Sequence, residues 1–244
     1  MEEKISIVIP TYNEINNIQK LLTSIQPVMD KVAPNYEILV IDDNSPDGTG
    51  KLVEKISKIN KKIRVIIRNE KTGLGDAYKC GFHNAQGDII FGMDADLSHD
   101  PKDIPKFLKG LKNSDIVVGS RNIKGGGHLN RDKRRIIISK IANILASFFF
   151  GLHLTDCTSG FRVYKRKVLE TIVPFVNCQK YTFLVEMLEK ASLFKFTISE
   201  VPIKFQDRLN GESKFNLSEV LEFLKVLIKK ILLIDRIRKK KDFL

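Results

Sequence analysis

Two acidic residues, Asp94 and Asp96, follow directly after an apolar run at 89–93 (Ile-Ile-Phe-Gly-Met). If that run is a buried strand, its end places both carboxylates where they can approach one hard divalent cation. Mg²⁺ and Mn²⁺ accept a few carboxylates and complete their coordination with water and phosphate oxygens. Since Asp-x-Asp alone usually marks a solvated turn, a metal–diphosphate site needs supporting residues elsewhere in the chain.

Polar and aromatic residues also end two earlier apolar runs, with Pro-Thr-Tyr-Asn-Glu at 10–14 and Asp-Asp-Asn-Ser-Pro-Asp-Gly at 42–48. Tyr12 can cover a nucleoside base, and Glu14 and Asp43 can accept hydrogen bonds from the base or the ribose. The second segment alone is only a favourable turn. Together, the two segments predict a nucleotide site beside the two acids.

Cations that could neutralise phosphates lie in the second half of the chain, at Arg121, Arg134, Arg135, Arg208 and Lys214. Each of them taken alone could be ordinary surface charge. The four histidines show no mutual metal-ligand spacing, and no Ser–His nucleophile arrangement is apparent. We therefore expect carboxylates and arginines to carry the chemistry.

The alternation of short apolar runs with helical patterns predicts how these residues converge. The predicted strands are 5–9, 36–41, 63–67, 88–93 and 115–119, and the predicted helices are 17–29, 49–58, 75–85 and 103–111. Such a series predicts an α/β fold with a doubly wound, mainly parallel sheet. Ligands of these sheets bind beyond the carboxyl ends of the strands, where both acids and both loops are expected.

Two common nucleotide-binding folds are excluded by the same loops. The first strand-to-helix turn contains no glycine, so the dinucleotide fingerprint is missing from it. The segment from Gly48 to Lys51 lacks the upstream glycine of a Walker A loop and continues into Leu52. NAD enzymes and P-loop nucleoside triphosphatases are therefore not expected.

The chain changes character after Arg121, where a glycine-rich stretch at 124–128 and a basic stretch at 131–135 predict a mobile loop. An amphipathic helix is expected to follow. Its apolar face would hold Ile137, Ile141, Ile144, Leu145 and Phe148, opposite Ser139, Lys140, Asn143 and Ser147. This helix could pack on the core or lie on a bilayer, and it is not convincingly transmembrane.

A second amphipathic helix is predicted from Leu217, followed by a basic tail at 236–241. It leaves the same two alternatives open, with basic residues facing anionic head groups in the bilayer case. The expected division is a single α/β domain at 1–216 and a membrane-surface element at 217–244.

Composition limits the partners of the chain. Its 244 residues include 41 Lys and Arg against 29 Asp and Glu, and the net charge of +12 favours nucleic acid, anionic lipid or sugar nucleotides. Nucleic acid is disfavoured, since the basic residues lie in loops and a tail without interleaved aromatics, and Asp94 and Asp96 would be unexplained. Three widely spaced cysteines and a start without signal-peptide features are typical of the reducing cytosol.

Six segments of the chain form an ordered set. They are Pro-Thr-Tyr-Asn-Glu at 10–14, Asp-Asp-Asn-Ser-Pro-Asp-Gly-Thr at 42–49, Met-Asp-Ala-Asp-Leu-Ser-His at 93–99, Gly-Ser-Arg at 119–121, Thr-Ser-Gly-Phe-Arg at 158–162, and Val-Pro-Ile-x-Phe-x-Asp-Arg at 201–208 running into Gly-Glu-Ser-Lys at 211–214. Along nearly its whole length the chain resembles glycosyltransferase family two and, within it, the dolichyl-phosphate mannosyltransferases.

The resemblance implies a GT-A fold and a set of site residues. The residues implied for GDP are Pro10, Tyr12, Glu14, Ile41 and Asp43, and those implied for Mg²⁺ or Mn²⁺ with the diphosphate are Asp94, Ala95 and Asp96. The residues implied for neutralising phosphates are Arg121, Arg208 and Lys214. The acceptor phosphate would be held by Arg135 and Ser139. Asp96 and Arg121 are the implied catalytic residues. No general base is required, because a phosphate monoester with a second pKa of about 6 is mostly a dianion at neutral pH. Ser98 stands where some archaeal relatives carry Gln.

The implied reaction is inverting transfer of mannose from GDP-mannose to dolichyl phosphate, which gives dolichyl β-D-mannosyl phosphate for glycosylation and GPI-anchor pathways. The implied location is the cytosolic face of the endoplasmic reticulum, or of the plasma membrane in a prokaryote, with small transmembrane subunits as partners in some members. The nearest alternative is a dolichyl-phosphate glucosyltransferase that uses UDP-glucose. A third alternative is an inactive scaffold that retains the fold.

Overall fold

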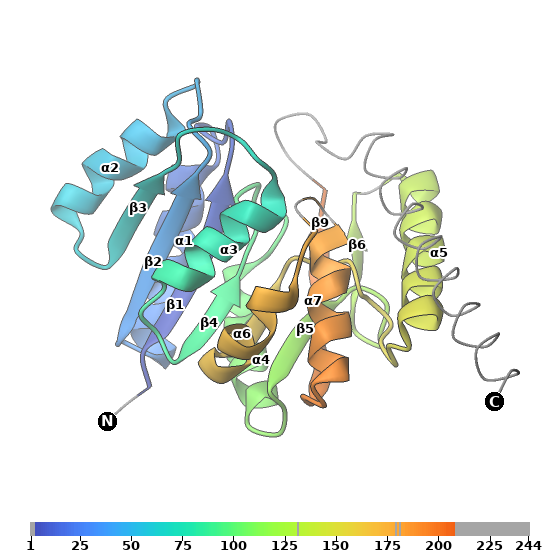
Figure 1. The fold of residues 1–244 in the computed structure, drawn as a ribbon. Helices are drawn as coiled ribbons and strands as arrows, with labels where there is room; N and C mark the ends of the chain where they lie inside the picture. The colour runs from blue at the N-terminus through green and yellow to red at the C-terminus, as the bar shows by residue number, and fades with distance from the viewer. Residues whose placement is uncertain (1–2, 131, 179, 181, 208–244) are drawn as a thin grey trace, which may run out of the picture.

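A central sheet organises the computed structural model, which describes residues 3–130, 132–178, 180 and 182–207 (Figure 1). Seven strands lie in the order β3-β2-β1-β4-β7-β5-β8. Their bounds are β1 Ile5–Thr11, β2 Tyr36–Asp42, β3 Ile63–Ile67, β4 Ile89–Gly92, β5 Ile116–Ser120, β7 Arg162–Lys165 and β8 Ile198–Pro202. Strand β7 runs antiparallel to β4 and β5, and the other pairs are parallel. The expected doubly wound, mainly parallel sheet is confirmed.

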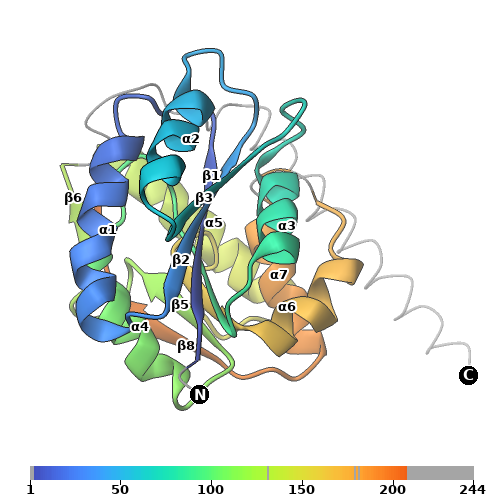
Figure 2. The ribbon, with the colours of Figure 1, turned by 90° about the vertical axis from the view of Figure 1, so that its left-hand side faces the viewer.

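Helices cover both faces of the sheet (Figure 2). One face carries α1 (Ile18–Val32), α2 (Thr49–Ile59) and α4 (Ile104–Leu111), and the other carries α3 (Leu74–Asn84), α6 (Arg166–Ile172) and α7 (Thr182–Leu193). Because side chains alternate along a strand, Ile7 and Ile9 of β1 enter the first core and Val8 enters the second. Burial on both faces explains why these strands are near-continuous apolar runs in the sequence.

The nine predicted elements of the first 119 residues are all present, with bounds that differ by at most three residues. Sequence analysis did not predict the later elements β7, α6, α7 and β8, nor the 3₁₀ turns Pro101–Asp103 and Val173–Phe175. Strand β7 gives little signal because it is short and begins with the charged residue Arg162. The helix predicted from Leu217 lies outside the described residues.

Two parts of the region predicted as a loop form regular secondary structure. Strand β6 (Gly127–Leu129) pairs in parallel with β9 (Lys204–Gln206). Helix α5 (Lys133–Phe150) then begins within the basic stretch, since the Asp132 carboxylate caps it by accepting the Arg134 backbone N–H at 2.6 Å. Arg134 and Arg135 therefore lie in the first helical turn.

Helix α5 stands at the end of the molecule opposite α2 (Figure 1). Within the described part of the chain, no helix is both long enough and apolar enough to cross a membrane.

Candidate active site

The loop after β4 holds Asp96 in one orientation. The Asp96 carboxylate is buried, and its Oδ1 accepts hydrogen bonds from the Ser98 backbone N–H at 3.1 Å and the Ser98 hydroxyl at 2.5 Å. Leu97, between them, adopts a left-handed backbone conformation with φ of 64°. Such a conformation is costly for a branched side chain and persists where surrounding contacts enforce it, often at functional sites.

Asp94 is the more accessible acid of the pair, with its side chain 30% exposed. Its backbone N–H donates to His99 Nδ1 at 3.2 Å, and the Tyr78 hydroxyl lies 3.4 Å from its Oδ1. A Cβ atom on Gly160 would lie 2.9 Å from the same Oδ1. Any larger residue at Gly160 would therefore push against this carboxylate and displace it from its present position.

Asp94 and Asp96 fit a hard divalent cation only if substrate completes its coordination. Among the described residues, no group of three or more His, Cys, Asp or Glu is arranged to hold a metal ion. Two carboxylates with no soft ligand match Mg²⁺ or Mn²⁺ that also binds diphosphate oxygens and water. The Asp94 side chain is 30% exposed, so solvent and a diphosphate can reach its carboxylate, which is consistent with such a site.

The loops after β1 and β2 are joined by hydrogen bonds that converge on two aspartates. Asp42 accepts from the Thr11 hydroxyl at 2.9 Å and from the Ser45 hydroxyl at 2.6 Å. Asp47 accepts from the Thr49 backbone N–H at 2.9 Å and from the Ile15 backbone N–H at 3.1 Å. The two predicted nucleotide loops therefore form one rigid edge beside Asp94.

The predicted nucleotide residues lie at this edge in different environments. Pro10 and Ile41 are paired across β1 and β2. Ile41 and Ala95 are buried in the core, so only their backbone atoms could meet a ligand. Glu14 is buried too, and its Oε2 accepts the Asn17 amide at 2.9 Å.

Two cations that sequence analysis missed approach the same edge. Arg68 Nη1 lies 2.8 Å from Asp43 Oδ1, and Lys71 Nζ lies 3.9 Å from the centre of the Tyr12 ring. Burial raises the pKa of Asp43, and the nearby Asp42 raises it further, while Arg68 and Lys71 oppose them. Arg68 and Lys71 follow directly after β3, and the end of β3 lies beside the end of β2. This position in the sequence could have predicted that both cations lie near the nucleotide loops.

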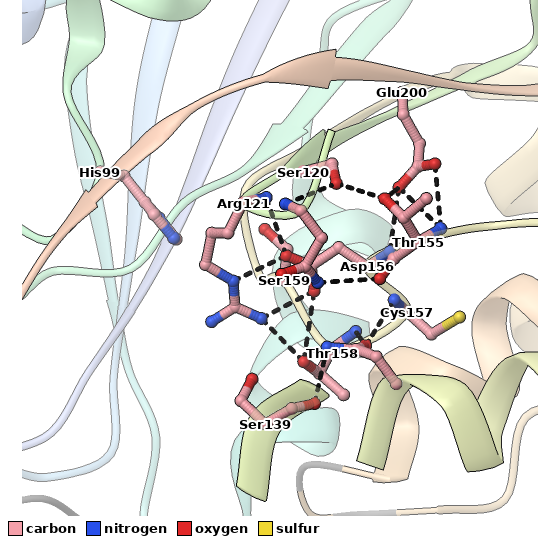
Figure 3. Close-up of polar contacts among 12 residues, drawn as sticks. His99, Ser120, Arg121, Ser139, Thr155, Asp156, Cys157, Thr158, Ser159 and Glu200 are labelled. Atoms are coloured by element: carbon pink, nitrogen blue, oxygen red, sulfur yellow. Dashed lines mark hydrogen bonds and ion pairs between the residues drawn. The ribbon is translucent and has the colours of Figure 1, made fainter. Parts of the chain in front are cut away.

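Arg121, the predicted catalytic cation, is held by an aspartate that sequence analysis did not single out (Figure 3). Its Nε lies 2.6 Å from Asp156 Oδ2 and its Nη2 2.7 Å from Asp156 Oδ1, and its backbone N–H also donates to Oδ2. The same Nη2 donates to the Thr158 hydroxyl at 2.8 Å. No local pattern marks this pair, since the two residues are 35 positions apart.

The pair is buried, with Asp156 at 0% exposed and Arg121 at 8%. Burial by itself would raise the pKa of Asp156, but the charge and hydrogen bonds of Arg121 outweigh burial and hold that pKa below its ordinary value. The structure thus explains how Arg121 is fixed. Its contact with a phosphate stays a prediction.

The expected acceptor-side residues lie on α5. Ser139 is half-buried, and its backbone carbonyl accepts the Asn143 amide at 3.0 Å (Figure 3). Arg135 is 55% exposed, with Nη1 4.0 Å from Asp207 Oδ2. Arg208 and Lys214 lie outside the described residues.

The core-packing alternative holds in part for α5, since Leu145 of the predicted apolar face packs against the core while the other four residues of that face are exposed. Ile137, Ile141, Ile144 and Phe148 are between 53% and 78% exposed. The helix instead turns Asn143, Ala146 and Phe150 inward. The physical reason is the buried Asn143 amide, whose Oδ1 accepts the backbone N–H groups of Cys157 at 2.8 Å and Thr158 at 3.1 Å.

Comparison with known sequences identifies the family of this fold and site. The profile of glycosyl transferase family 2 matches residues 6–173. The chain is 35% identical to an undecaprenyl-phosphate mannosyltransferase from Micrococcus luteus, over 87% of this chain and 88% of the relative. It is 36% identical to a polyprenol monophosphomannose synthase from Mycolicibacterium smegmatis, over 88% of this chain and 82% of the relative.

Solved structures agree with the fold. Glucosyl-3-phosphoglycerate synthase from Mycobacterium tuberculosis, in complex with Mn²⁺, UDP and glucosyl-3-phosphoglycerate, has a TM-score of 0.67 at 21% identity and covers 94% of this chain and 79% of its own. The same enzyme in complex with phosphoglyceric acid has a TM-score of 0.66. The resemblance inferred from six sequence segments is confirmed, and the chain belongs to glycosyltransferase family 2.

Proposed function

We propose that this enzyme transfers mannose from GDP-mannose to a polyprenyl phosphate with inversion at the anomeric carbon. The observation that carries the proposal is the identity of about 35% over most of the chain to two enzymes named for mannose transfer to polyprenyl phosphates. Dolichyl phosphate, expected from the sequence, is one member of this acceptor class.

The donor would lie along the edge formed by the loops after β1, β2 and β4. Asp43 and Glu14 would accept hydrogen bonds from the nucleoside, with Tyr12 beside its base. Asp94 and Asp96 would hold Mg²⁺ or Mn²⁺, which supplies positive charge to the departing diphosphate. A solved structure of similar fold, bound to Mn²⁺ and UDP, supports the divalent cation.

The acceptor would approach from α5, with Arg135 and Ser139 at its phosphate. One acceptor oxygen attacks the anomeric carbon as the bond to the diphosphate oxygen breaks, so an α-linked donor gives a β-linked product. The acceptor is already a dianion near neutral pH, and no proton has to be removed. The residues of the chain then act by orienting the two substrates and stabilising charge. Arg121, aligned by Asp156, would face the developing negative charge.

Peripheral attachment to a membrane surface would give access to this lipid. The exposed apolar face of α5 and the basic residues of its first turn are typical of a helix lying in the head-group region. A cavity of about 610 Å³ beside that face, with walls that include Ile144, Phe148 and Leu152, could take part of the prenyl chain. Both named relatives are bacterial, which favours the plasma membrane over the endoplasmic reticulum. Small transmembrane subunits stay a prediction.

The decisive experiment measures radiolabelled hexose transferred into a lipid extract. Purified protein is incubated with liposomes that contain undecaprenyl or dolichyl phosphate, with GDP-mannose or UDP-glucose, and with Mg²⁺, Mn²⁺ or EDTA. Mannolipid that disappears with EDTA is expected. Glucolipid alone would assign the UDP-glucose alternative, and no product with either donor would contradict the proposal and favour an inactive scaffold.

A further inference from the structure

One loop, residues 155–160, contacts both the acceptor side and the metal side of the site, and we call it the bridging loop. On the acceptor side it is held by Asn143 of α5, which is 2% exposed. Asn143 Oδ1 accepts the backbone N–H groups of Cys157 at 2.8 Å and Thr158 at 3.1 Å, while its amide donates to the Ser139 carbonyl. A single side chain therefore joins the bridging loop to the turn of α5 that carries Ser139.

The other contacts of the bridging loop reach the groups proposed to act on the donor. Asp156 and Thr158 hold the guanidinium of Arg121 (Figure 3). Gly160 lies directly against the carboxylate of Asp94. A shift of the bridging loop relative to α5 would therefore move Arg121 and crowd Asp94.

A buried arginine stiffens the bridging loop from inside. Arg162 is 1% exposed, and it donates from Nε to the Ser159 carbonyl and from Nη2 to the Cys157 carbonyl, both at 2.6 Å. With its carbonyls held by Arg162 and two of its N–H groups held by Asn143, the bridging loop can transmit a displacement from one end to the other.

We propose that Asn143 is a positioning residue for glycosyl transfer: through the bridging loop it sets the placement of the α5 acceptor residues relative to Arg121 and Asp94. The proposal rests on the proposed function for the roles of Ser139 and Arg135. Asn143 lines the cavity proposed for the prenyl chain, but its side-chain polar atoms are bonded to backbone groups of α5 and the bridging loop, so it acts on the reacting groups through other residues. In-line transfer is sensitive to such placement, since an error of about 1 Å can cost roughly 100-fold in rate.

The chemistry of the contact indicates which substitutions test it. Alanine removes the acceptor of two buried N–H groups and leaves them unsatisfied. Aspartate keeps an oxygen that can accept both of them, but it adds a buried charge and places its second oxygen against the Ser139 carbonyl. Asn84 of α3 supplies a matched control, because its amide donates to the Cys80 carbonyl four residues earlier, as Asn143 donates to Ser139, but Asn84 is exposed.

The kinetic test compares N143A, N143D and N84A with the wild type in the liposome assay. For N143A we expect kcat/KM for the polyprenyl phosphate to fall at least tenfold, while calorimetry finds a clearly smaller loss of affinity for GDP with Mn²⁺. N143D should recover part of the loss, because it keeps the acceptor of the two N–H groups, and N84A should match the wild type. Wild-type kinetics in folded N143A, or an equal loss of acceptor efficiency and GDP affinity, would overturn the proposal.

Hydrogen exchange gives a readout that does not depend on turnover. In N143A the amides of residues 157–158 should exchange faster, and so should those of residues 94–98, because the bridging loop lies against Asp94. Faster exchange confined to residues 157–158 would contradict the coupling. If the wild type transferred no mannose, the proposed function would fail, and this exchange pattern would still decide whether Asn143 links α5 to the metal side.

Discussion

Two regions of the molecule are held together differently. The donor edge is formed by the loops after β1, β2 and β4, and the acceptor side is formed by α5 and the bridging loop. At the donor edge, carboxylates such as Asp42 and Asp47 bond to residues at neighbouring strand ends and helix starts. On the acceptor side the main contacts are buried polar ones that lie beyond the paired residues of the strands, such as Arg121 with Asp156 and Asn143 with Cys157. Parallel strand ends bring the first region together and short-range hydrogen bonds reinforce it, whereas the second region depends mainly on buried polar side chains.

The pKa of a buried carboxylate is also shifted in opposite directions in the two regions. Burial and the neighbouring Asp42 raise the pKa of Asp43 at the donor edge, despite the opposing charge of Arg68. On the acceptor side Arg121 outweighs burial and lowers the pKa of Asp156. Both carboxylates have an arginine partner, but only at Asp156 does that partner outweigh burial.

The largest effect is expected at the metal side of the donor edge. Asp96→Ala should lower transfer by roughly 1,000-fold or more, because charge stabilisation of the departing group is commonly worth that much. The assay is mannolipid formation, accompanied by calorimetric titration of Mn²⁺ with GDP. Asp103→Asn is the matched control, since Asp103 lies on the 3₁₀ turn after this loop and pairs with Lys106 of α4. Retained activity with intact metal dependence would exclude this role for Asp96.

The next largest effect is expected in the Arg121–Asp156 pair. Asp156→Asn should lower the free energy of unfolding by about 3–5 kcal/mol, because it leaves a buried guanidinium without its anion. Urea unfolding measures this loss. Replacing both partners, as in R121M with D156L, should restore much of the stability. If that double variant also transferred mannose normally, Arg121 would be structural and its phosphate role would be wrong.

The free energy of unfolding should depend on pH in opposite ways through Asp156 and Asp43. Asp156 has a lowered pKa in the folded state, so its contribution to stability is full above the unfolded-state pKa of about 3.9 and is lost as pH falls through the folded value. Asp43 has a raised pKa, so its ionisation costs stability as pH rises through that value. Urea unfolding across pH should therefore show D156N approaching wild type in acid, and D43N exceeding wild type near neutrality. If D156N and D43N were both less stable, or both more stable, than the wild type near neutral pH, the contrast between the two carboxylates would be wrong.

A smaller effect is expected at the exposed face of α5. Ile144→Ser with Phe148→Ser should reduce binding to anionic liposomes at least about tenfold, since two large apolar side chains can no longer enter the interface. Vesicle sedimentation measures the partitioning. Ile59→Ser is the control, because Ile59 is 89% exposed on α2, at the opposite end of the molecule. Equal losses in the two proteins would mean that α5 has no special membrane role.

The smallest effect is expected in the loop that joins β2 to α2. Asp47→Ala should lower the free energy of unfolding by about 1 kcal/mol, a typical value for the loss of a helix-start cap, because exposed Asp47 accepts the Thr49 N–H there. Urea unfolding of D47A and of D156N compares the loss of unfolding free energy at the donor edge with that on the acceptor side. A loss in D47A as large as that in D156N would remove the distinction between them.

Sequence patterns predicted the donor half of the molecule well for a physical reason. Apolar runs buried on both faces mark parallel strands, and parallel strands bring their carboxyl ends to one edge. Asp94, Asp43 and Tyr12 could therefore be grouped before any contact was known. Arg68 and Lys71 could have been added by the same rule, since they follow β3.

The acceptor half carried no comparable signal. Asp156 gives no signal of its own beside the segment 158–162, because an aspartate in a loop is usually solvated. The amphipathic pattern of α5 identified the helix but not which face points inward, since it counts apolar residues and cannot register that Asn143 finds two buried N–H partners.

By itself, the sequence determined the α/β class, the doubly wound sheet, the acids at the end of β4 and the family, because each depends on local periodicity or on residues a few positions apart. Only the tertiary structure decided that Arg121 is neutralised by Asp156, that β7 is antiparallel between β4 and β5, and that α5 turns most of its apolar face to solvent. These depend on which buried polar groups find partners once distant segments meet, and the cost of leaving such groups unpaired selects the arrangement.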